Sequence, residues 1–424
     1  MPIRPTHFSG FALRKTAYIA GAIVTVAGLA ACGSDQPGPT GVTSPPDLSS
    51  AQAPASAIWQ ETARSLVAQA SLTPLAAARA YGFVGVGQYL AVQRSDASLN
   101  DLGISNNEAA RRSQVNRGAV AGVSVVVLRY LFPAKVEALE EMVKEQGTGM
   151  ARGSDQMARD FSEGERIGRV LGAGIVTRAT SDHFDDANTA VPPDGDGFWT
   201  SSAIPALAVS GGSEPGVTRW FITSAKQFRP AAPPAFGSPD FNSALAEIRR
   251  MSDTRTSAQA EIAARWAMNP GTATAPGFWL DVASQEIVKR GVSERVAAHV
   301  FALLSATMAD AVIGCWDAKL TYWLIRPWKA DEGITTLAAV GKPNHPSYPS
   351  GHSCVSSSAA EVLGTVFADK RAEFDAMAAE AGLSRMYAGI HYRFDIDAGA
   401  ALGRSVARFA IAADATGSSV LTDR

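Results

Sequence analysis

Apolar residues recur every three or four positions along most of the chain, which is the period of an α-helix that buries one face. Ser, Asp or Thr often stands at the start of such a segment and Gly or Pro at its end, as expected of helix caps. Sustained strand-like alternation is missing from the sequence. The pattern predicts helices over residues 56–70, 73–92, 106–131, 133–145, 155–173, 243–251, 257–268, 277–289, 294–325, 353–367, 370–381 and 395–412. We therefore expect an all-α fold made of helical bundles.

One stretch breaks the helical period. Residues 177–240 are rich in Gly, Pro, Ser and Asp, so we expect loops there. The longest apolar segment after the N-terminal leader, 118–128, is too short to span a membrane and is expected to be a core helix. The chain is predicted to divide into a leader at 1–31, a tether at 32–55, an N-terminal helical region at 56–189, a connector at 190–240, a C-terminal helical bundle at 241–413 and a tail at 414–424.

The N-terminus has the composition of an export signal. Arg4, Arg14 and Lys15 precede an apolar run over 17–31. The run ends in Leu-Ala-Ala-Cys, which resembles a bacterial lipobox, so we expect cleavage before Cys32 and attachment of lipid to that cysteine. The protein would then be an exported lipoprotein, periplasmic or at the cell surface, that meets the membrane only through its anchor. The alternative is an ordinary signal peptide with an incidental cysteine.

The net charge limits the classes of partner that we expect, and the cysteine content bears on disulfide pairing. The formal net charge of −2 gives no reason to expect nucleic acid as a partner. Besides Cys32 the chain has only Cys315 and Cys354. In an exported protein these two can pair in a disulfide, and the alternative is a pair of buried thiols.

Candidate chemistry is concentrated in three short blocks of the last quarter of the chain. The first is K-x6-R-P, with Lys319 and Arg326. Both belong to or follow the helix predicted over 294–325. Seven residues separate them, so on a helix they share a face and lie about 10 Å apart along the axis. Two long cationic side chains can then converge on one anion, the Lys as a point charge and the Arg as a planar fork.

The second block is P-S-G-H, which we expect to form a turn that opens a helix. Ser350 can donate its hydroxyl, and Gly351 lets the backbone approach a ligand closely. Free amides and the positive end of the helix dipole would face the same anion. His352 stands where an imidazole can act as a general acid or base.

The third block, S-R-x5-H-x3-D, contains Arg385, His391 and Asp395. Arg385 offers another guanidinium fork. On a helix, a carboxylate four residues after a histidine can accept the proton of one ring nitrogen. The other nitrogen is then free to attack phosphorus or to ligate a metal. Together the blocks predict a site for a tetrahedral oxyanion beside two histidines.

The three blocks resemble the signature of the superfamily that joins vanadium-dependent haloperoxidases to type 2 phosphatidic acid phosphatases and bacterial acid phosphatases. The run Arg-Met-Tyr-Ala-Gly-Ile-His-Tyr-Arg-Phe-Asp at 385–395 resembles the haloperoxidase version of the third block. Segments of the connector resemble bacterial haloperoxidase-like proteins, at 192–199, 227–230, 233–234 and 237–239. The resemblance covers residues 190–410 and implies an all-α bundle of the haloperoxidase and acid phosphatase type.

The resemblance also implies a vanadate cofactor and a role for each residue. His391 would bind the vanadium and Asp395 would orient its ring. His352 would manage protons, and Lys319 would polarise bound peroxide. The oxygens of vanadate would be held by Lys319, Arg326, Ser350, Gly351, His352 and Arg385. The implied reaction is oxidation of a halide by hydrogen peroxide to a hypohalous acid, with an organic acceptor as a further small-molecule substrate.

Two further positions bear on the halide. Trp316 matches an aromatic position of the haloperoxidase pocket, and the segment from His345 to His352 resembles the bromoperoxidase form. The resemblance therefore favours bromide or iodide over chloride. The alternative is that His345 is a polar loop residue.

Two other functions use the same residues. In an acid phosphatase, His391 would attack phosphorus and form a phosphohistidine, while His352 would protonate the leaving group and the cations would stabilise the transition state. In a non-catalytic oxyanion-binding lipoprotein, cations and amides alone would suffice. The sequence is also compatible with a homo-oligomer.

Overall fold

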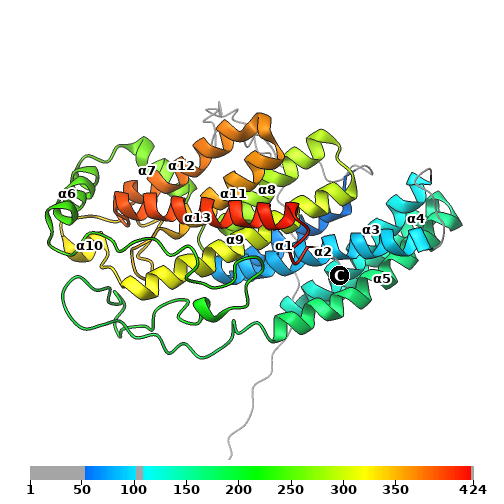
Figure 1. The fold of residues 1–424 in the computed structure, drawn as a ribbon, viewed down its shortest axis with the longest axis horizontal. Coiled ribbons are helices and arrows are strands. Elements are labelled where there is room, and N and C mark those ends of the chain that lie inside the picture. The colour runs from blue at the N-terminus through cyan, green and yellow to red at the C-terminus, as the bar shows by residue number, and fades with distance from the viewer. Residues whose placement is uncertain (1–52, 102–107, 422–424) are drawn as a thin grey trace, which may run out of the picture. The chain divides into compact units, whose positions relative to one another are not determined.

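The computed structural model describes residues 53–101 and 108–421. Within these residues thirteen α-helices form and no β-strand does, so the predicted all-α fold is confirmed (Figure 1). The leader, Cys32 and the predicted helix start at residue 106 lie outside the described residues. The helices are α1 (Ala55–Gln69), α2 (Pro74–Asp101), α3 (Ala109–Leu131), α4 (Val136–Gly153), α5 (Asp155–Thr180), α6 (Pro239–Asp253), α7 (Ser257–Arg265), α8 (Thr274–Arg290), α9 (Glu294–Tyr322), α10 (Pro327–Ala330), α11 (Gly351–Val366), α12 (Arg371–Tyr387) and α13 (Arg393–Ala415).

Helix α9 is the core helix of the fold. It packs against α2, α8, α11 and α13, and Figure 1 shows α13 running alongside it. Its apolar residues cover all faces, as expected of a helix surrounded by protein. By length and composition α9 could cross a membrane, but 89% of its most apolar window is buried inside the protein. The prediction that 118–128 is the longest apolar segment after the leader is therefore wrong.

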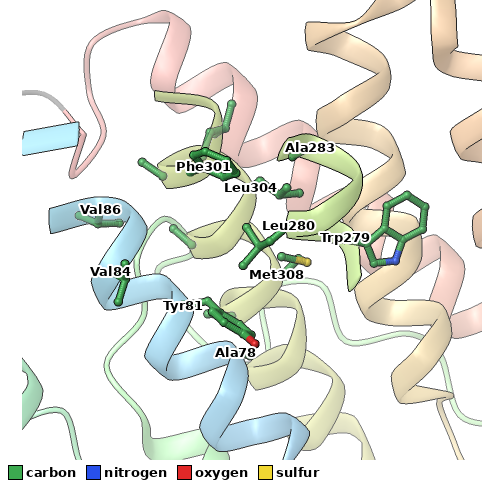
Figure 2. Close-up of a cluster of buried hydrophobic side chains, with 14 of the residues drawn as sticks. Ala78, Tyr81, Val84, Val86, Trp279, Leu280, Ala283, Phe301, Leu304 and Met308 are labelled. Carbon is green, nitrogen blue, oxygen red and sulfur yellow. The ribbon is translucent and has the colours of Figure 1, made fainter. Parts of the chain in front are cut away.

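Large side chains fill the core where α2, α8 and α9 meet. Figure 2 shows Tyr81 of α2 and Met308 of α9 in one buried cluster, with Trp279 of α8 at its edge. The Tyr81 hydroxyl donates a hydrogen bond to the Ala273 carbonyl at 3.0 Å, and Trp279 Nε1 donates one to Ser356 Oγ at 3.1 Å. This core joins the N-terminal helices to the helices that bear the three blocks. The boundaries of the six predicted parts stay predictions.

Helices α3 and α5 lie side by side and approach through glycine (Figure 1). A Cβ added at Gly118 would lie 2.0 Å from the Phe161 carbonyl oxygen, and one added at Gly164 would lie 1.9 Å from the Val115 carbonyl oxygen. Only a residue without a side chain permits so close a backbone contact. The glycines of α3 and α5 therefore set the distance between the two helices.

Most predicted helices are confirmed, with shifted ends. Helices α2, α4 and α5 continue beyond their predicted ends, so the first four residues of the predicted loop at 177–240 are helical. Helix α9 ends at Tyr322, three residues early, because Trp323 adopts a left-handed φ of 50°. Pro327 begins α10, a short helix that the pattern did not predict. Proline suits that first position because its missing N–H would have no partner there.

The connector between α5 and α6 is fastened to the core by a buried carboxylate. Asp310 of α9 accepts hydrogen bonds from the backbone amides of Trp220, Phe221 and Ile222, at 2.7 to 2.9 Å. These three bonds satisfy amides that would otherwise be buried without an acceptor. They hold the connector on the helix whose far end carries the first block.

Candidate oxyanion site

The structure brings the three blocks together at the ends of five helices, α9 to α13. Lys319 lies in the last turn of α9, and Arg326 follows α9 in extended backbone and caps α10. The P-S-G-H block opens α11, Arg385 lies near the end of α12, and His391 and Asp395 flank the start of α13. The predicted convergence is therefore found. The predicted shared helical face of Lys319 and Arg326 is wrong, because the helix ends between them.

His391 and Asp395 form the expected pair. His391 Nδ1 lies 2.8 Å from Asp395 Oδ2, and both residues are almost fully buried. His391 itself precedes α13, so the prediction that both stand on one helix is wrong, although the pairing is confirmed. Asp395 Oδ2 also accepts hydrogen bonds from Ser347 Oγ at 2.5 Å and from the Tyr392 amide at 3.1 Å. Three donors thus fix the carboxylate that orients the imidazole.

Arg326 lies directly behind the other nitrogen of that ring. Its Nη1 is 3.1 Å from His391 Nε2 and donates to the Ile390 carbonyl at 2.7 Å. Since a guanidinium can only donate, Nε2 accepts and the proton of the neutral ring stays on Nδ1. His391 therefore carries its lone pair on Nε2, the atom that a metal or a phosphorus centre needs, and Arg326 must release that lone pair before Nε2 can bind such a centre.

Lys319 is fully buried, and its ammonium group is engaged by backbone. It donates to the carbonyl oxygens of Pro346 at 2.9 Å and Ser347 at 3.0 Å, and also to that of Pro349. Its side chain does not line the cavity described below. In this arrangement Lys319 holds the loop before α11 and adds positive charge behind the site.

The start of α11 presents amides and an imidazole. Ser350 is the N-cap and accepts a hydrogen bond from the Ser353 amide, while the first amides of α11 have no partner within the helix. His352 Nε2 lies 2.8 Å from the Trp266 carbonyl oxygen, an atom that can only accept. His352 therefore carries its proton on Nε2 and keeps Nδ1 as a proton acceptor.

Arg385 is the cation with open donors. It is 1% exposed, its Nε donates to Ser384 Oγ, and its Nη2 donates to the Ala263 carbonyl, both at 2.9 Å. In the part of the chain that the structure describes, Nη1 has no hydrogen-bond partner and no carboxylate pairs with the group. Burial alone lowers the pKa of Arg385. A buried guanidinium without a counter-charge is costly, and a bound anion would relieve that cost.

A cavity of about 810 Å³ opens onto these residues. Gly351, His352, Arg385 and His391 line it, whereas Lys319, Arg326, Ser350 and Asp395 stand behind the lining. The halide-pocket residues also line it: the rings of Trp316 and His345 lie 5.0 Å apart, and Trp316 Nε1 donates to the Ser210 carbonyl at 2.9 Å. The structure thus brings every predicted oxyanion residue into one cluster, but only some of these residues line the cavity.

Burial and unbalanced charge shift the titration of the site. Burial, with Arg326 and Lys319 nearby, lowers the pKa of His391 well below its usual value, and burial with Arg385 does the same for His352. Burial lowers the pKa of Lys319 to about 8. Burial raises the pKa of Asp395 to about 6, although the hydrogen bond from Ser347 lowers it. At neutral pH both histidines are therefore neutral, as a ligating or proton-accepting role requires.

The two cysteines lie together behind the site. The sulfur atoms of Cys354 and Cys315 are 2.7 Å apart, both residues are buried, and no disulfide joins them in this structure, so the two alternatives stay predictions. Cys315 belongs to α9 and Cys354 to α11. The contact therefore joins the helices of the first and second blocks without a covalent bond.

Sequence reasoning missed two residues of this region. Ser347, inside the segment from His345 to His352, donates a hydrogen bond to the carboxylate that orients His391. Its position two residues before Pro349, next to the second block, could have indicated it in the sequence. Glu214, in the connector, lines the cavity, and nothing in the surrounding sequence marks it. Its position results from tertiary packing alone.

The donor set fits a tetrahedral oxyanion. Three buried cations, Lys319, Arg326 and Arg385, and one buried carboxylate, Asp395, surround His391, whose Nε2 carries a lone pair. Charge-assisted bonds of this kind are the strong ones in anion recognition. Among the described residues no group of three or more His, Cys, Asp or Glu side chains could hold a metal cation. Vanadate, an anion that one histidine can ligate, suits this set.

Comparison with known proteins agrees with the motifs. The sequence profile of the PAP2 superfamily matches residues 296–416, which contain all three blocks, and so agrees with the resemblance seen in the sequence. No curated protein sequence matches the chain. The fold is similar to that of a bacterial vanadium-dependent iodoperoxidase, with a TM-score of 0.69 and 21% identity over 84% of this chain and 95% of that one. It is also similar to a bacterial vanadium-dependent chloroperoxidase in its apo form, with a TM-score of 0.63 and 12% identity over 83% and 96% of the two chains.

Proposed function

We propose that this chain of the PAP2 superfamily is a vanadium-dependent haloperoxidase that oxidises iodide or bromide with hydrogen peroxide. The balanced reaction is H2O2 + X⁻ + H⁺ → HOX + H2O. One observation carries the proposal: His391 offers an Nε2 lone pair among three buried cations that a single carboxylate cannot balance. Residues of these types fit vanadate, which would supply Lewis-acid activation of peroxide when bound.

Each residue of the cluster has a role in this proposal. His391 Nε2 would ligate vanadium once Arg326 releases it, and Asp395 keeps the proton on Nδ1 so that Nε2 stays unprotonated. Arg385 Nη1 and the first amides of α11 neutralise anionic oxygens at the cavity wall. Lys319 and Arg326 add positive charge from behind. His352 Nδ1, held as an acceptor by the bond to Trp266, takes the proton of incoming hydrogen peroxide.

The halide is proposed to be iodide or bromide. His345 packs against Trp316 at the cavity wall and accepts a hydrogen bond from Arg326 Nη2 at 3.1 Å. Burial, with Lys319 and Arg326 nearby, lowers the pKa of His345 well below its usual value, so the ring is neutral. Entry into a cavity with a neutral, largely apolar wall costs a large, weakly hydrated halide less desolvation free energy than a small one.

Phosphatase activity is the second candidate, because His391 Nε2 is also placed as a nucleophile toward a bound phosphate ester. That reaction needs His352 to give a proton to the leaving group. The lowered pKa of His352 leaves the ring without that extra proton at neutral pH. In the free protein this position is therefore a proton acceptor, and an anion bound beside it would raise the pKa of His352 again.

We also propose that the protein is exported and held at a membrane by lipid on Cys32. The support is the sequence at 29–32. Expression of the full chain in a bacterium, followed by separation of membranes, should recover the protein in the membrane fraction. Cys32→Ser should move it to the soluble fraction. Membrane recovery of that variant would contradict the anchor.

The test of the enzymatic proposal is a vanadate titration of the protein without residues 1–31. Oxidation of iodide and of bromide by hydrogen peroxide should rise with added orthovanadate and saturate. His391→Ala should lower the rate of halide oxidation by about a thousandfold or more, because the nitrogen that would ligate the vanadium is lost. His183→Ala is the matched control, since that histidine is exposed, lies outside the cavity lining and pairs with Asp186. No oxidation of either halide, together with vanadate-inhibited release of nitrophenol from nitrophenyl phosphate, would instead establish a phosphatase.

A further inference from the structure

Two cysteines from different helices meet in the core behind the oxyanion site. Cys315 of α9 and Cys354 of α11 are both fully buried, and their sulfur atoms lie 2.7 Å apart. A disulfide bond is about 2.0 Å long, so the sulfurs need to approach by only about 0.7 Å to form one. Helices α9 and α11 already pack against each other, so that approach requires no large rearrangement.

Neither thiol has a competing partner. The chain has three cysteines, and the third, Cys32, lies outside the described residues. A thiol that is oxidised alone passes from sulfenic acid to sulfinic and sulfonic acids, whereas a neighbouring thiol captures the sulfenic acid as a disulfide. Cys315 and Cys354 are therefore placed to react with each other.

The surroundings give the two thiols different acidity. Burial alone would raise the pKa of Cys315, but the hydrogen bond from Cys354 and the charge of Lys319 lower it on balance. Burial raises the pKa of Cys354 well above its usual value. Cys315 therefore carries more thiolate, which is the form that attacks a peroxide, and Cys354 remains the thiol that captures the product.

The pair lies next to residues of the cavity wall. Trp316, which follows Cys315, and Val355, which follows Cys354, both line the cavity. Hydrogen peroxide is small and neutral, so on entering the cavity it comes close to the two sulfurs. Larger oxidants are kept from them by burial, since neither side chain is exposed.

A bond between the sulfurs would connect two parts of the oxyanion site. Cys315 Sγ lies 3.8 Å from the Pro349 carbonyl oxygen, which also accepts a hydrogen bond from Lys319 Nζ. Cys354 lies in the first turn of α11, three residues after Gly351. The bond would therefore tie the end of α9 that carries Lys319 to the start of α11.

We propose that Cys315 and Cys354 are a site of oxidative modification, at which hydrogen peroxide closes a disulfide that fixes the first block to the second. The reaction is 2 R–SH + H2O2 → R–S–S–R + 2 H2O. The sulfur of Cys315 attacks one peroxide oxygen, the O–O bond breaks, and the other oxygen leaves as water. The sulfur of Cys354 then displaces the hydroxyl of the sulfenic acid as a second water, so that both sulfurs are oxidised and both peroxide oxygens are reduced.

The test uses the protein without residues 1–31 and with Cys32→Ser, so that only the buried pair can react. It is prepared reduced, freed of reductant and treated with hydrogen peroxide. The thiols titrated after unfolding should fall from two to none, and peptide mapping should find Cys315 linked to Cys354. The midpoint of thermal unfolding should rise by roughly 5 °C, because the bond closes a loop of about 40 residues in the unfolded chain.

Two variants in the same background locate the bond and the attacking sulfur. Cys315→Ser and Cys354→Ser each keep one thiol, so peroxide should not raise the midpoint of either. In Cys354→Ser the remaining Cys315 should gain oxygen, because no second thiol captures its sulfenic acid. In Cys315→Ser the remaining thiol should react more slowly. Both variants also control for oxidation of methionine, to which all three proteins are equally open.

Three results would overturn the proposal: two thiols that persist after peroxide, a disulfide between two molecules instead of within one, or an equal rise of the midpoint in the serine variants. The reaction needs neither vanadate nor halide, so its outcome is independent of the proposed function. A protein that forms the disulfide but oxidises no halide would reject the haloperoxidase and keep the modification site. The reverse combination would keep the enzyme and reject the modification site.

Discussion

The α3–α5 pair and the α11–α13 pair both pack backbone against backbone, yet only the second builds a site. In the first, glycines such as Gly164 meet carbonyl oxygens of the partner helix. In the second, a Cβ added at Gly403 would lie 2.2 Å from the Cys354 carbonyl oxygen, and one added at Gly399 would lie 2.6 Å from that of Ser350. Close approach through glycine is therefore a property of this fold and does not mark function.

The difference between the two pairs is the charge that each buries. At the start of α11 and α13, the Ser350 amide donates to the Asp395 carbonyl at 2.9 Å, which holds the two helix ends together. Around that bond lie three buried cations and one buried carboxylate. Burial of charge without a counter-charge lowers the stability of a protein. Such charge is typical of sites where it binds a ligand or takes part in a reaction. The comparison predicts that packing changes affect folding and that charge changes affect binding.

The largest effect is expected from Gly164→Ala in α5. The new methyl group would lie 1.9 Å from the Val115 carbonyl oxygen, so the helices must separate, and we expect a loss of about 3–5 kcal/mol of unfolding free energy. Chemical denaturation measures it. Gly174→Ala is the control on the same helix, because nothing lies within 4 Å of its Cβ position, and it should raise stability by up to about 1 kcal/mol. Equal effects of the two substitutions would contradict glycine-mediated packing.

The next largest effect is expected from removing a buried charge, which should raise the stability of the fold and lower the affinity for an anion. Arg385→Met removes a buried guanidinium that has no counter-charge, so the ligand-free protein should gain about 1 kcal/mol of stability. Affinity for orthovanadate should fall about 10- to 100-fold, because charge-assisted bonds are lost. Calorimetric titration measures that affinity, and Arg404→Met, at an exposed position of α13, is the control. A destabilised variant with unchanged affinity would mean that Arg385 serves packing only.

The smallest effect is the pH dependence of anion binding. Burial lowers the pKa of Lys319 to about 8, so in the free protein the ammonium loses its charge as the pH rises through 8. Affinity for inorganic phosphate, whose dianion predominates across this window, should therefore fall by up to about tenfold per pH unit above 8. In Lys319→Gln the fall should be shallower, as measured by the same titration at each pH. Parallel profiles for the two proteins would show that Lys319 does not titrate with binding.

Much of the site could be predicted from the sequence, because its chemistry follows from local spacing. The His391–Asp395 pair and the cap at Ser350 depend on residues three or four apart. The orientation of Lys319 could not be predicted, since its partners are backbone carbonyls of a loop distant in sequence. Helix α9 ends early because Trp323 adopts a left-handed backbone conformation. Such a conformation is usually indicated by a glycine, and the sequence has none at this position. The position of Glu214 at the cavity wall depends on the tertiary packing of the connector, which no local pattern predicts.

The central claim is that the buried cations form an incomplete cluster that an oxyanion completes. Its most direct test is the thermal unfolding of the protein without residues 1–31, with and without orthovanadate. The midpoint should rise with vanadate, by a stabilisation of about 2.7 kcal/mol at a hundredfold excess over the dissociation constant, and the rise should be lost in His391→Ala. A midpoint that stays constant up to millimolar vanadate in the unaltered protein would contradict the claim.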